Sequence, residues 1–254
     1  MLIAVAGATG RLGKHLVEVL EERGHGVVPI SRSHGVDVIT GAGLAEALTG
    51  VDCIIDAATG PSPDQDEATA FFTSASRNLH EAGHACGVRR MVVVSIVGIE
   101  QLAGGYSVAK VAHEQAALAG PVPVRILRAT QFHEFVGQLL DWGTQGEVGY
   151  VTDMRTQLVA ARSVAETLVD LATDAAWAPE AQPPTLEIAG PRVENLVDAA
   201  TLVAARRGYP TKVEVGTNPD DPDAAANAGG ALLPGPGAIV AGPTFEEWLD
   251  TTMP

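Results

Sequence analysis

Ala4-Val5-Ala6-Gly7-Ala8-Thr9-Gly10-Arg11-Leu12-Gly13 is the stretch that decides the fold. The apolar run that begins at Met1 is too short for a helix, and Gly7 ends it where the chain must turn sharply. After the turn, apolar side chains recur at helical spacing, with charged residues between them: Leu12, Leu16, Val19 and Leu20. The stretch therefore predicts a buried strand, a glycine turn and an amphipathic helix, in that order.

Three glycines stand three residues apart in this turn. At such a turn the backbone can approach a pyrophosphate closely, and the third glycine lets the helix pack against the strand. The free N–H groups at the start of the helix attract phosphate. We therefore expect a dinucleotide to bind across the turn, at Gly7, Thr9, Gly10, Arg11, Leu12 and Gly13. The alternative is a tight turn that holds no ligand.

Length and composition favour one compact α/β body. Of the 254 residues, 46% are hydrophobic but only 4% are aromatic, so the core must consist of small aliphatic side chains, as in parallel sheets. The net charge of −15 and the absence of a basic run argue against a nucleic-acid partner. Without a signal sequence or a long apolar run, we expect a cytoplasmic protein with no membrane partner.

The second strand, Val27–Ile30, is followed by Ser31-Arg32-Ser33. At the end of this strand an acid would bind a ribose 2′-hydroxyl, whereas an arginine would bind a 2′-phosphate. Because Arg32 and Ser33 stand there without an acid, we expect NADP(H) to be preferred, with NAD(H) as the alternative cofactor. An exposed loop arginine would give the same pattern. Residues 35–39 are interpreted as a brief third strand, in which Asp37 contacts adenine or serves as a turn carboxylate.

A further strand over Val51–Ala58 ends at small residues that leave space for a ribose: Ala57, Ala58 and Thr59. The helix that follows, from Ala68 to Cys86, carries His80 and His84 at a spacing that zinc ligands use. No acid or cysteine cluster accompanies the two histidines. We therefore expect them on a solvated helix face and predict no metal site.

Chemistry is predicted where the central strand Met91–Gly98 ends. Ser95 lies near that end, where ligands bind in open parallel sheets. Tyr106 and Lys110 are four residues apart and therefore share one helix face. A nearby ammonium lowers the pKa of a tyrosine, so Tyr106 could donate a proton while Lys110 holds the ribose and Ser95 the substrate oxygen. A solvated tyrosine–lysine pair on a surface helix is the alternative.

After the strand at Val122–Leu127, the chain leaves the sheet through residues placed to line a nicotinamide: Ala129, Thr130, Gln131 and Phe132. His133 and Glu134 are interpreted as pocket lining or surface. We predict a dinucleotide-binding core over residues 1–141. Residues 142–254 are expected to complete the sheet and form a substrate lobe, with helices over 163–172 and 195–207, strands over 185–189 and 212–215, and a loop or lid over 218–236.

Two segments carry a resemblance to a known family: Gly7-Ala8-Thr9-Gly10-Arg11-Leu12-Gly13 and Leu127-Arg128-Ala129-Thr130-Gln131-Phe132. The chain resembles the short-chain dehydrogenase/reductase superfamily, in its atypical, NmrA-like NAD(P)H-binding branch. The resemblance implies a Rossmann-type, doubly wound parallel sheet with a small C-terminal substrate-binding lobe. It also implies that Ser95, Tyr106 and Lys110 form the catalytic set. The catalytic asparagine of the superfamily falls near Phe72, whereas Asn78 matches a later, structural position.

Two hypotheses about function follow. The first is an NADPH-dependent oxidoreductase that acts on a small carbonyl compound or quinone, as a monomer or homodimer. The second is a non-catalytic NADP(H) sensor of the same branch. A sugar-nucleotide epimerase or dehydratase is less favoured, because the chain beyond residue 141 is short for a large substrate domain.

Overall fold

The computed structural model describes residues 1–178, 183–218 and 220–253. The chain forms two compact units whose segments alternate along the sequence. The first unit comprises Met1–Ser95, Gly105–Arg128 and Val164–Leu186, and the second comprises Ile96–Gly104, Ala129–Ser163 and Glu187–Pro254. A single domain boundary near residue 141 stays a prediction.

A seven-stranded parallel sheet runs through the fold in the order β12-β9-β5-β4-β3-β1-β2. Ala6 at the end of β1 lies opposite Ile30 of β2 and Asp56 of β3, so the carboxyl ends of these three strands are level. The strand order reverses at β1, which is where parallel sheets bind ligands. The strands are β1 Leu2–Ala6, β2 Gly26–Ile30, β3 Cys53–Asp56, β4 Arg90–Ile96, β5 Val124–Ala129, β9 Thr185–Ala189 and β12 Ile239–Val240. The predicted doubly wound α/β fold is confirmed.

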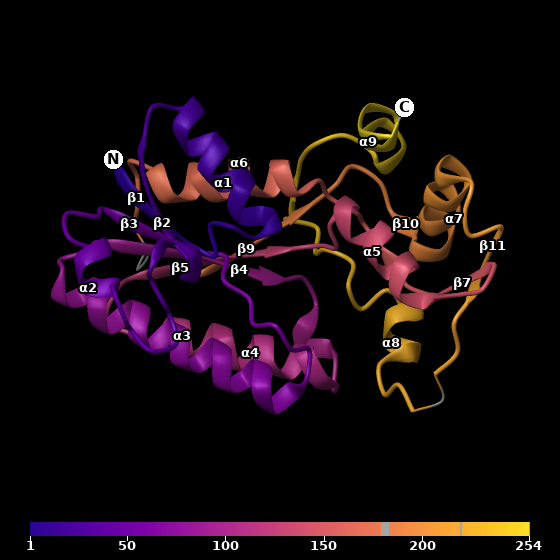
Figure 1. Ribbon diagram of the computed structural model, residues 1–254, viewed down its shortest axis with the longest axis horizontal. Coiled ribbons are helices and arrows are strands. Elements are labelled where there is room, and N and C mark those ends of the chain that lie inside the picture. The colour runs from indigo at the N-terminus through magenta and orange to yellow at the C-terminus, as the bar shows by residue number, and fades with distance from the viewer. Residues whose placement is uncertain (179–182, 219, 254) are drawn as a thin grey trace. The chain divides into compact units, whose positions relative to one another are not determined.

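Helices cover both faces of this sheet. Helices α1 (Arg11–Glu22) and α6 (Ala161–Thr173) lie on one face, and α3 (Gln65–Ala85) and α4 (Gly105–Leu118) lie on the other (Figure 1). The short helices η1 (Arg32–His34), α2 (Leu44–Ala47) and η2 (Ile99–Gln101) occupy connections. Small aliphatic side chains fill the space between the layers, among them Ala4, Ile30, Leu44, Ile54 and Val93.

The third strand predicted over residues 35–39 does not form, and that prediction is wrong. The carboxylate of Asp37 accepts a hydrogen bond from the Ile39 N–H at 2.8 Å, which closes a turn. The Asn78 amide donates to the carbonyl oxygens of Val38 and Ile39 at 2.9 and 2.8 Å. These side-chain bonds occupy the backbone groups that a strand ladder would need. Asp37 is therefore the turn carboxylate, and Asn78 has a structural role.

The two histidines of α3 differ in their surroundings. His80 is 2% exposed, and its Nδ1 accepts the Val122 N–H at 3.3 Å. Burial lowers the pKa of His80. His84 is exposed. The expectation of a solvated face is therefore wrong for His80.

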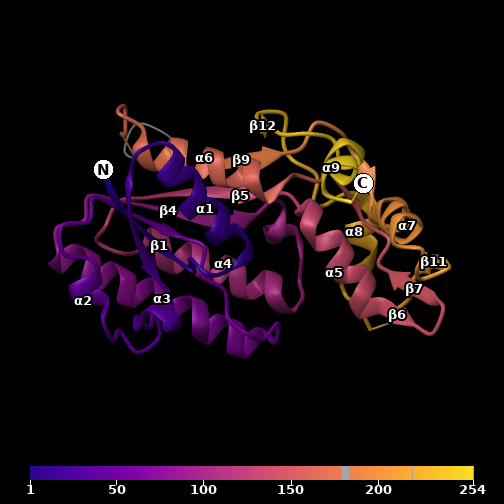
Figure 2. The ribbon, with the colours of Figure 1, turned by 45° about the horizontal axis from the view of Figure 1, so that its top comes forward.

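The second unit contains its own small core. Helix α5 (His133–Gly143) packs on α7 (Leu196–Arg207) and on the three-stranded sheet β11-β7-β6, as Figure 2 shows. Leu140, Leu158, Val203 and Phe245 are buried in this core. The remaining elements are β6 Thr144–Gln145, β7 Val148–Val151, β8 Arg155–Thr156, β10 Glu194–Asn195, β11 Lys212–Val215, α8 Ala224–Gly229 and α9 Phe245–Thr252. Helix α8 lies within the predicted loop. No helix in the described residues has the length and apolar character of a membrane span.

Candidate functional site

The opening turn is fixed by contacts between backbone atoms. Gly7 has a φ of +78°, a conformation that favours glycine, and its N–H donates to the Ile30 carbonyl oxygen at 3.0 Å. A Cβ atom on Gly7 would lie 2.6 Å from the Ala57 oxygen. On Gly13 it would lie 2.0 Å from the Gly7 oxygen. Backbone packing alone therefore requires glycine at both positions.

The N-terminus of α1 faces the same turn. Its N-cap, Gly10, has no side chain that could cap the helix, and no acidic residue occupies the first helical turn. The first N–H groups of a helix carry partial positive charge and lack partners within the helix. This end of α1 therefore suits a phosphate. Arg11 is exposed there, whereas Leu12 and Gly13 are buried.

A cavity of about 580 Å³ lies beside this turn, where β1, β2 and β3 end. We call it the first cavity. Half of the predicted cofactor residues line it: Gly7, Thr9, Gly10, Arg32, Ser33, Ala57, Ala58 and Thr59. Other lining residues are Ile30, Ser31, residues 36–39, Pro61 and Phe71. Sequence reasoning missed Phe71, because its position on α3 gives no local sign that it faces a cavity. Arg11, Leu12 and Gly13 are not part of the lining.

One corner of the first cavity is polar and carries a cation. The Ser31 hydroxyl lies 2.9 Å from the Ser33 hydroxyl and 2.7 Å from Nδ1 of His34. Arg32 is exposed and has no ion pair within the described part of the chain. Two hydroxyls and a guanidinium are groups that bind a phosphate well.

Tyr106 is joined to the first cavity through Thr59. Its hydroxyl lies 3.1 Å from the Thr59 hydroxyl, and its ring meets the Phe72 ring edge-on at 5.7 Å between centroids. Burial raises the pKa of Tyr106, and the Thr59 hydrogen bond offsets part of the rise. The lowering expected from Lys110 is not found. The phenol therefore stays protonated at neutral pH, which is the form of a proton donor.

Lys110 is turned into the protein. Its Nζ donates to the Val94 carbonyl oxygen at 2.9 Å and lies 2.8 Å from Nδ1 of His113. No hydrogen bond joins Lys110 to Tyr106 or Ser95 in the residues that the structure covers. Sequence spacing places the two side chains on one face of α4, but the direction of the lysine amine depends on the acceptors around it. Contact between Lys110 and a ribose stays a prediction.

Ser95 lies next to Val94 at the end of β4 and is 3% exposed. Its hydroxyl is buried and has no hydrogen-bond partner among the described residues. A buried hydroxyl without a partner is uncommon and indicates a group available to a ligand. Ser95 thus lies near the end of the central strand, as the sequence predicts. Its catalytic role stays a prediction.

The predicted nicotinamide-lining residues belong to the second unit. Ala129 ends β5, and the Thr130 hydroxyl donates to the Gln157 carbonyl oxygen at 2.5 Å. The Gln131 side chain accepts a hydrogen bond from the Thr156 hydroxyl, and Phe132 is the N-cap of α5. A role for these four residues in cofactor binding stays a prediction.

The two residues that follow serve the core of the second unit. His133 is buried against the rings of Phe245 and Trp248, with 5.3 Å between ring centroids in each pair, and burial lowers its pKa to about 4. The Glu134 carboxylate accepts the Ala161 N–H at 3.1 Å, at the start of α6. The interpretation of His133 as pocket lining or surface is therefore wrong.

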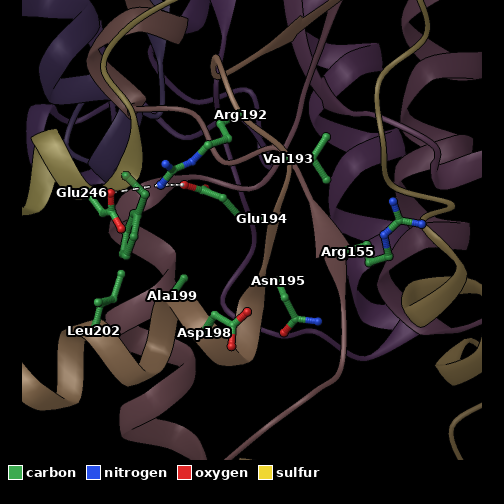
Figure 3. Close-up of a pocket in the computed structure, with 10 residues that line it drawn as sticks. Arg155, Arg192, Val193, Glu194, Asn195, Asp198, Ala199, Leu202 and Glu246 are labelled. Carbon is green, nitrogen blue, oxygen red and sulfur yellow. Dashed lines mark ion pairs between the residues drawn. The ribbon is translucent and has the colours of Figure 1, made fainter.

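A second cavity, of about 450 Å³, lies wholly within the second unit and was not predicted. Figure 3 shows Arg192 between Glu194 and Glu246, at 3.7 and 3.2 Å from their carboxylates. Asp198 and Arg155 add further charges to the lining. Burial raises the pKa of Glu194, although the Arg192 charge partly opposes the rise. The charged groups of the second cavity thus partly neutralise one another.

Comparison with known proteins adds a family to this geometry. Residues 3–120 match the NAD dependent epimerase/dehydratase family. No match was found among curated proteins. These residues include the glycine turn, the first cavity, Ser95, Tyr106 and Lys110. The match supports an enzyme with a nicotinamide cofactor.

Similar solved structures share the fold at low sequence identity. MoeE5 in complex with UDP-glucose and NAD is 20% identical, with both chains covered completely and a TM-score of 0.72. The enzyme WbmG from Bordetella bronchiseptica in complex with NAD is 16% identical over 99% of this chain and 94% of that chain, with a TM-score of 0.70. A UDP-N-acetylglucosamine 4-epimerase from Bacillus cereus is 17% identical over 99% of this chain and 94% of that one, with a TM-score of 0.67.

Proposed function

We propose that the protein is a nicotinamide-dependent oxidoreductase with Tyr106 as its proton donor, and the match of residues 3–120 to the NAD dependent epimerase/dehydratase family supports this. The single observation that carries the proposal is the hydrogen bond between Tyr106 and Thr59, which connects a protonated phenol to the lining of the first cavity. The NmrA-like branch stays a prediction.

The lining of the first cavity suits the phosphate and ribose parts of a dinucleotide. A Cβ atom at Gly7 or Gly13 would collide with backbone, so the tight turn brings the N-terminus of α1 to the cavity. Its N–H groups would hold the pyrophosphate. The small side chains of Ala57 and Ala58 leave room for a ribose. When bound, the nicotinamide supplies or accepts the hydride.

We further propose that the protein prefers NADP(H). Arg32, Ser31 and Ser33 lie together in the first cavity, and Arg32 has no ion pair in the described chain. The lining does contain one carboxylate, Asp37, but one of its oxygens is bonded to the Ile39 N–H. The structural relatives named above contain NAD, so this preference is the first point to test.

For the substrate we propose a small carbonyl compound or quinone. Burial keeps Tyr106 protonated, so its hydroxyl can donate to an oxygen that gains charge as hydride arrives. The unpartnered Ser95 hydroxyl would hold the same oxygen. A nucleotide sugar is the second candidate, because the matched family includes epimerases and dehydratases and MoeE5 binds UDP-glucose.

The experiment is to follow NADPH and NADH oxidation with a panel of carbonyl compounds, quinones and keto-sugar nucleotides. We expect Tyr106→Phe to reduce kcat by about 100-fold to 10,000-fold on the accepted substrate, because the general acid is lost. The exposed Tyr150 of the second unit provides the control, Tyr150→Phe, which should keep full activity. Full turnover by Tyr106→Phe would show that Tyr106 is not the general acid. Dinucleotide binding without any oxidation would favour the sensor hypothesis.

A further inference from the structure

A chain of three buried titratable side chains lies next to the Tyr106 ring. Asp56 is the last residue of the buried strand β3, and His113 and Lys110 lie one turn apart on α4. Their exposed fractions are 1%, 1% and 5%. Nε2 of His113 lies 3.2 Å from an Asp56 carboxylate oxygen, and Nδ1 of His113 lies 2.8 Å from Nζ of Lys110. The three residues form a continuous hydrogen-bonded chain.

The hydrogen-bonding partners assign the protons in this chain. An ammonium can only donate, so Nδ1 of His113 accepts from Lys110. His113 must then carry its proton on Nε2 and donate it to Asp56, whose other carboxylate oxygen accepts the Ala58 N–H at 3.0 Å. Lys110 also donates to the Val94 oxygen. The chain holds one positive and one negative charge and is neutral overall.

The Phe72 ring connects this chain to Tyr106. His113 stacks on the ring at 4.6 Å with a 17° tilt, and Nζ of Lys110 lies 4.6 Å from the ring centroid. Tyr106 meets the edge of the same ring. The Phe72 ring thus contacts the lysine, the histidine and the tyrosine at once.

Burial and charge set the protonation of Lys110. Burial lowers its pKa to about 8, while the negative charges of Asp56 and Glu114 oppose the fall. Glu114 is itself paired with Arg128 at 2.7 Å, which leaves Asp56 as the countercharge within the chain. The other titratable groups nearby are His113, Tyr106 and His80. Burial opposes the ionisation of Asp56, but the hydrogen bond from His113, with further help from the Ala58 N–H and the Lys110 charge, outweighs it and lowers the Asp56 pKa.

We propose that Asp56 and His113 are positioning residues: His113 accepts from the Lys110 ammonium and holds it over the Phe72 ring, and the Asp56 carboxylate balances its charge. Burial and the Lys110 charge lower the pKa of His113, so its imidazole stays neutral. When Lys110 becomes neutral, its proton therefore passes to the solvent. The role of these three buried residues in turnover rests on the proposed function. The effect of Asp56 and His113 on the protonation of Lys110 does not depend on it.

The first test uses stability and needs no substrate. The free energy of unfolding is measured between pH 6 and 10.5 for the unmodified protein, Lys110→Met, Asp56→Asn and the double variant. Lys110 loses its proton at a lower pH in the native state than in the unfolded chain. Its contribution to stability should therefore rise with pH from about 8. In the Asp56→Asn background the rise should begin roughly one pH unit lower. A rise at the same pH in both backgrounds would overturn the proposal.

If Asp56→Asn does not fold, Asp56→Ser replaces it. A serine hydroxyl can still accept from His113 but carries no negative charge, so the same downward shift is expected. His80→Gln removes another buried imidazole, one that is bonded to Val122 and lies outside the chain, and it should leave the onset unchanged.

The second test is the pH profile of NAD(P)H oxidation. Asp56→Asn should move the profile of kcat to lower pH, in step with Lys110, while the KM for the dinucleotide stays within about threefold. A profile that does not move, in an enzyme that still turns over, overturns the role in turnover alone. If no acceptor supports NAD(P)H oxidation, the proposed function is overturned, and with it the role of the three buried residues in turnover. The stability measurement still decides whether Asp56 and His113 control the protonation of Lys110.

Discussion

The two cavities, one in each unit, differ in how their charges are arranged. The first cavity is lined largely by backbone and small side chains, and its one arginine, Arg32, has no ion pair in the described chain. The second cavity is lined by charged side chains, and its Arg192 is paired with Glu194 and Glu246. A cation that is already paired offers little to an anionic ligand. The first cavity therefore keeps a guanidinium that could bind an anionic ligand, in a chain whose net charge is −15.

The comparison also teaches which part of a site depends on side chains. In the first cavity, the N–H groups of α1 and the glycine turn would bind phosphate whatever the nearby side chains were. In the second, the Arg192 charge depends on two side chains, those of Glu194, two residues away, and of Glu246, which is distant in sequence. The predictions below test these two arrangements, from the largest expected effect to the smallest.

The largest effect is expected from Gly13→Ala. The added methyl would lie 2.0 Å from the Gly7 oxygen and 2.8 Å from Cα of Ala8, and neither backbone atom can move without opening the turn. We expect the free energy of unfolding to fall by about 2 kcal/mol or more, which exceeds the gain of about 1 kcal/mol from placing alanine in a helix. Affinity for NADPH should fall at least tenfold. Thermal unfolding and titration calorimetry measure the two effects.

The matched control for this prediction is Gly237→Ala. Open space surrounds the position of its added methyl, so stability and dinucleotide affinity should both be preserved. If Gly13→Ala bound NADPH as tightly as the unmodified protein, the helix start would not be the pyrophosphate site.

An intermediate effect is expected from Arg32→Ala. A hydrogen bond to a charged group contributes about 1.5 to 3 kcal/mol, so loss of the guanidinium should weaken NADPH binding by roughly tenfold or more. NADH binding should change less than twofold, because NADH has no 2′-phosphate. Arg155→Ala removes an exposed arginine from the second cavity and should change neither affinity. If Arg32→Ala weakened the binding of NADPH and of NADH equally, Arg32 would contact a part of the cofactor that both dinucleotides share.

The sequence predicted the strand, turn and helix beside the first cavity because their determinants are local. A strand, a glycine turn and a helix follow one another within about twenty residues, and the positive φ of Gly7 is a property of that turn. The segment at 35–39 was misread because its strand-like pattern cannot show that Asn78, some forty residues later, binds its carbonyl oxygens.

The buried partners of Lys110 could not be read from the sequence. Helical periodicity placed Tyr106 and Lys110 on one face, but the direction of the amine is set by Val94 and His113. His113 in turn bonds Asp56, which lies 57 residues earlier in the chain. Single-sequence patterns describe spacing within an element, whereas pairs such as these form only when β3 and α4 meet in the fold.

The smallest effect is expected from Glu194→Gln, and it appears as a dependence of stability on pH. Burial raises the pKa of Glu194, so the native state binds this proton more tightly than the unfolded chain does. Stability therefore falls as pH rises from the usual carboxyl pKa of about 4.3 towards the raised value. Glutamine does not titrate. As pH rises over this range, the Tm of the variant should therefore increase relative to that of the unmodified protein, by about 2 °C. Arg192→Met removes the charge that opposes the rise and should extend the range to higher pH. The difference in Tm between Glu194→Gln and the unmodified protein could also stay constant from pH 4 to 7. That result would mean that the charges of the second cavity are not balanced as the structure indicates.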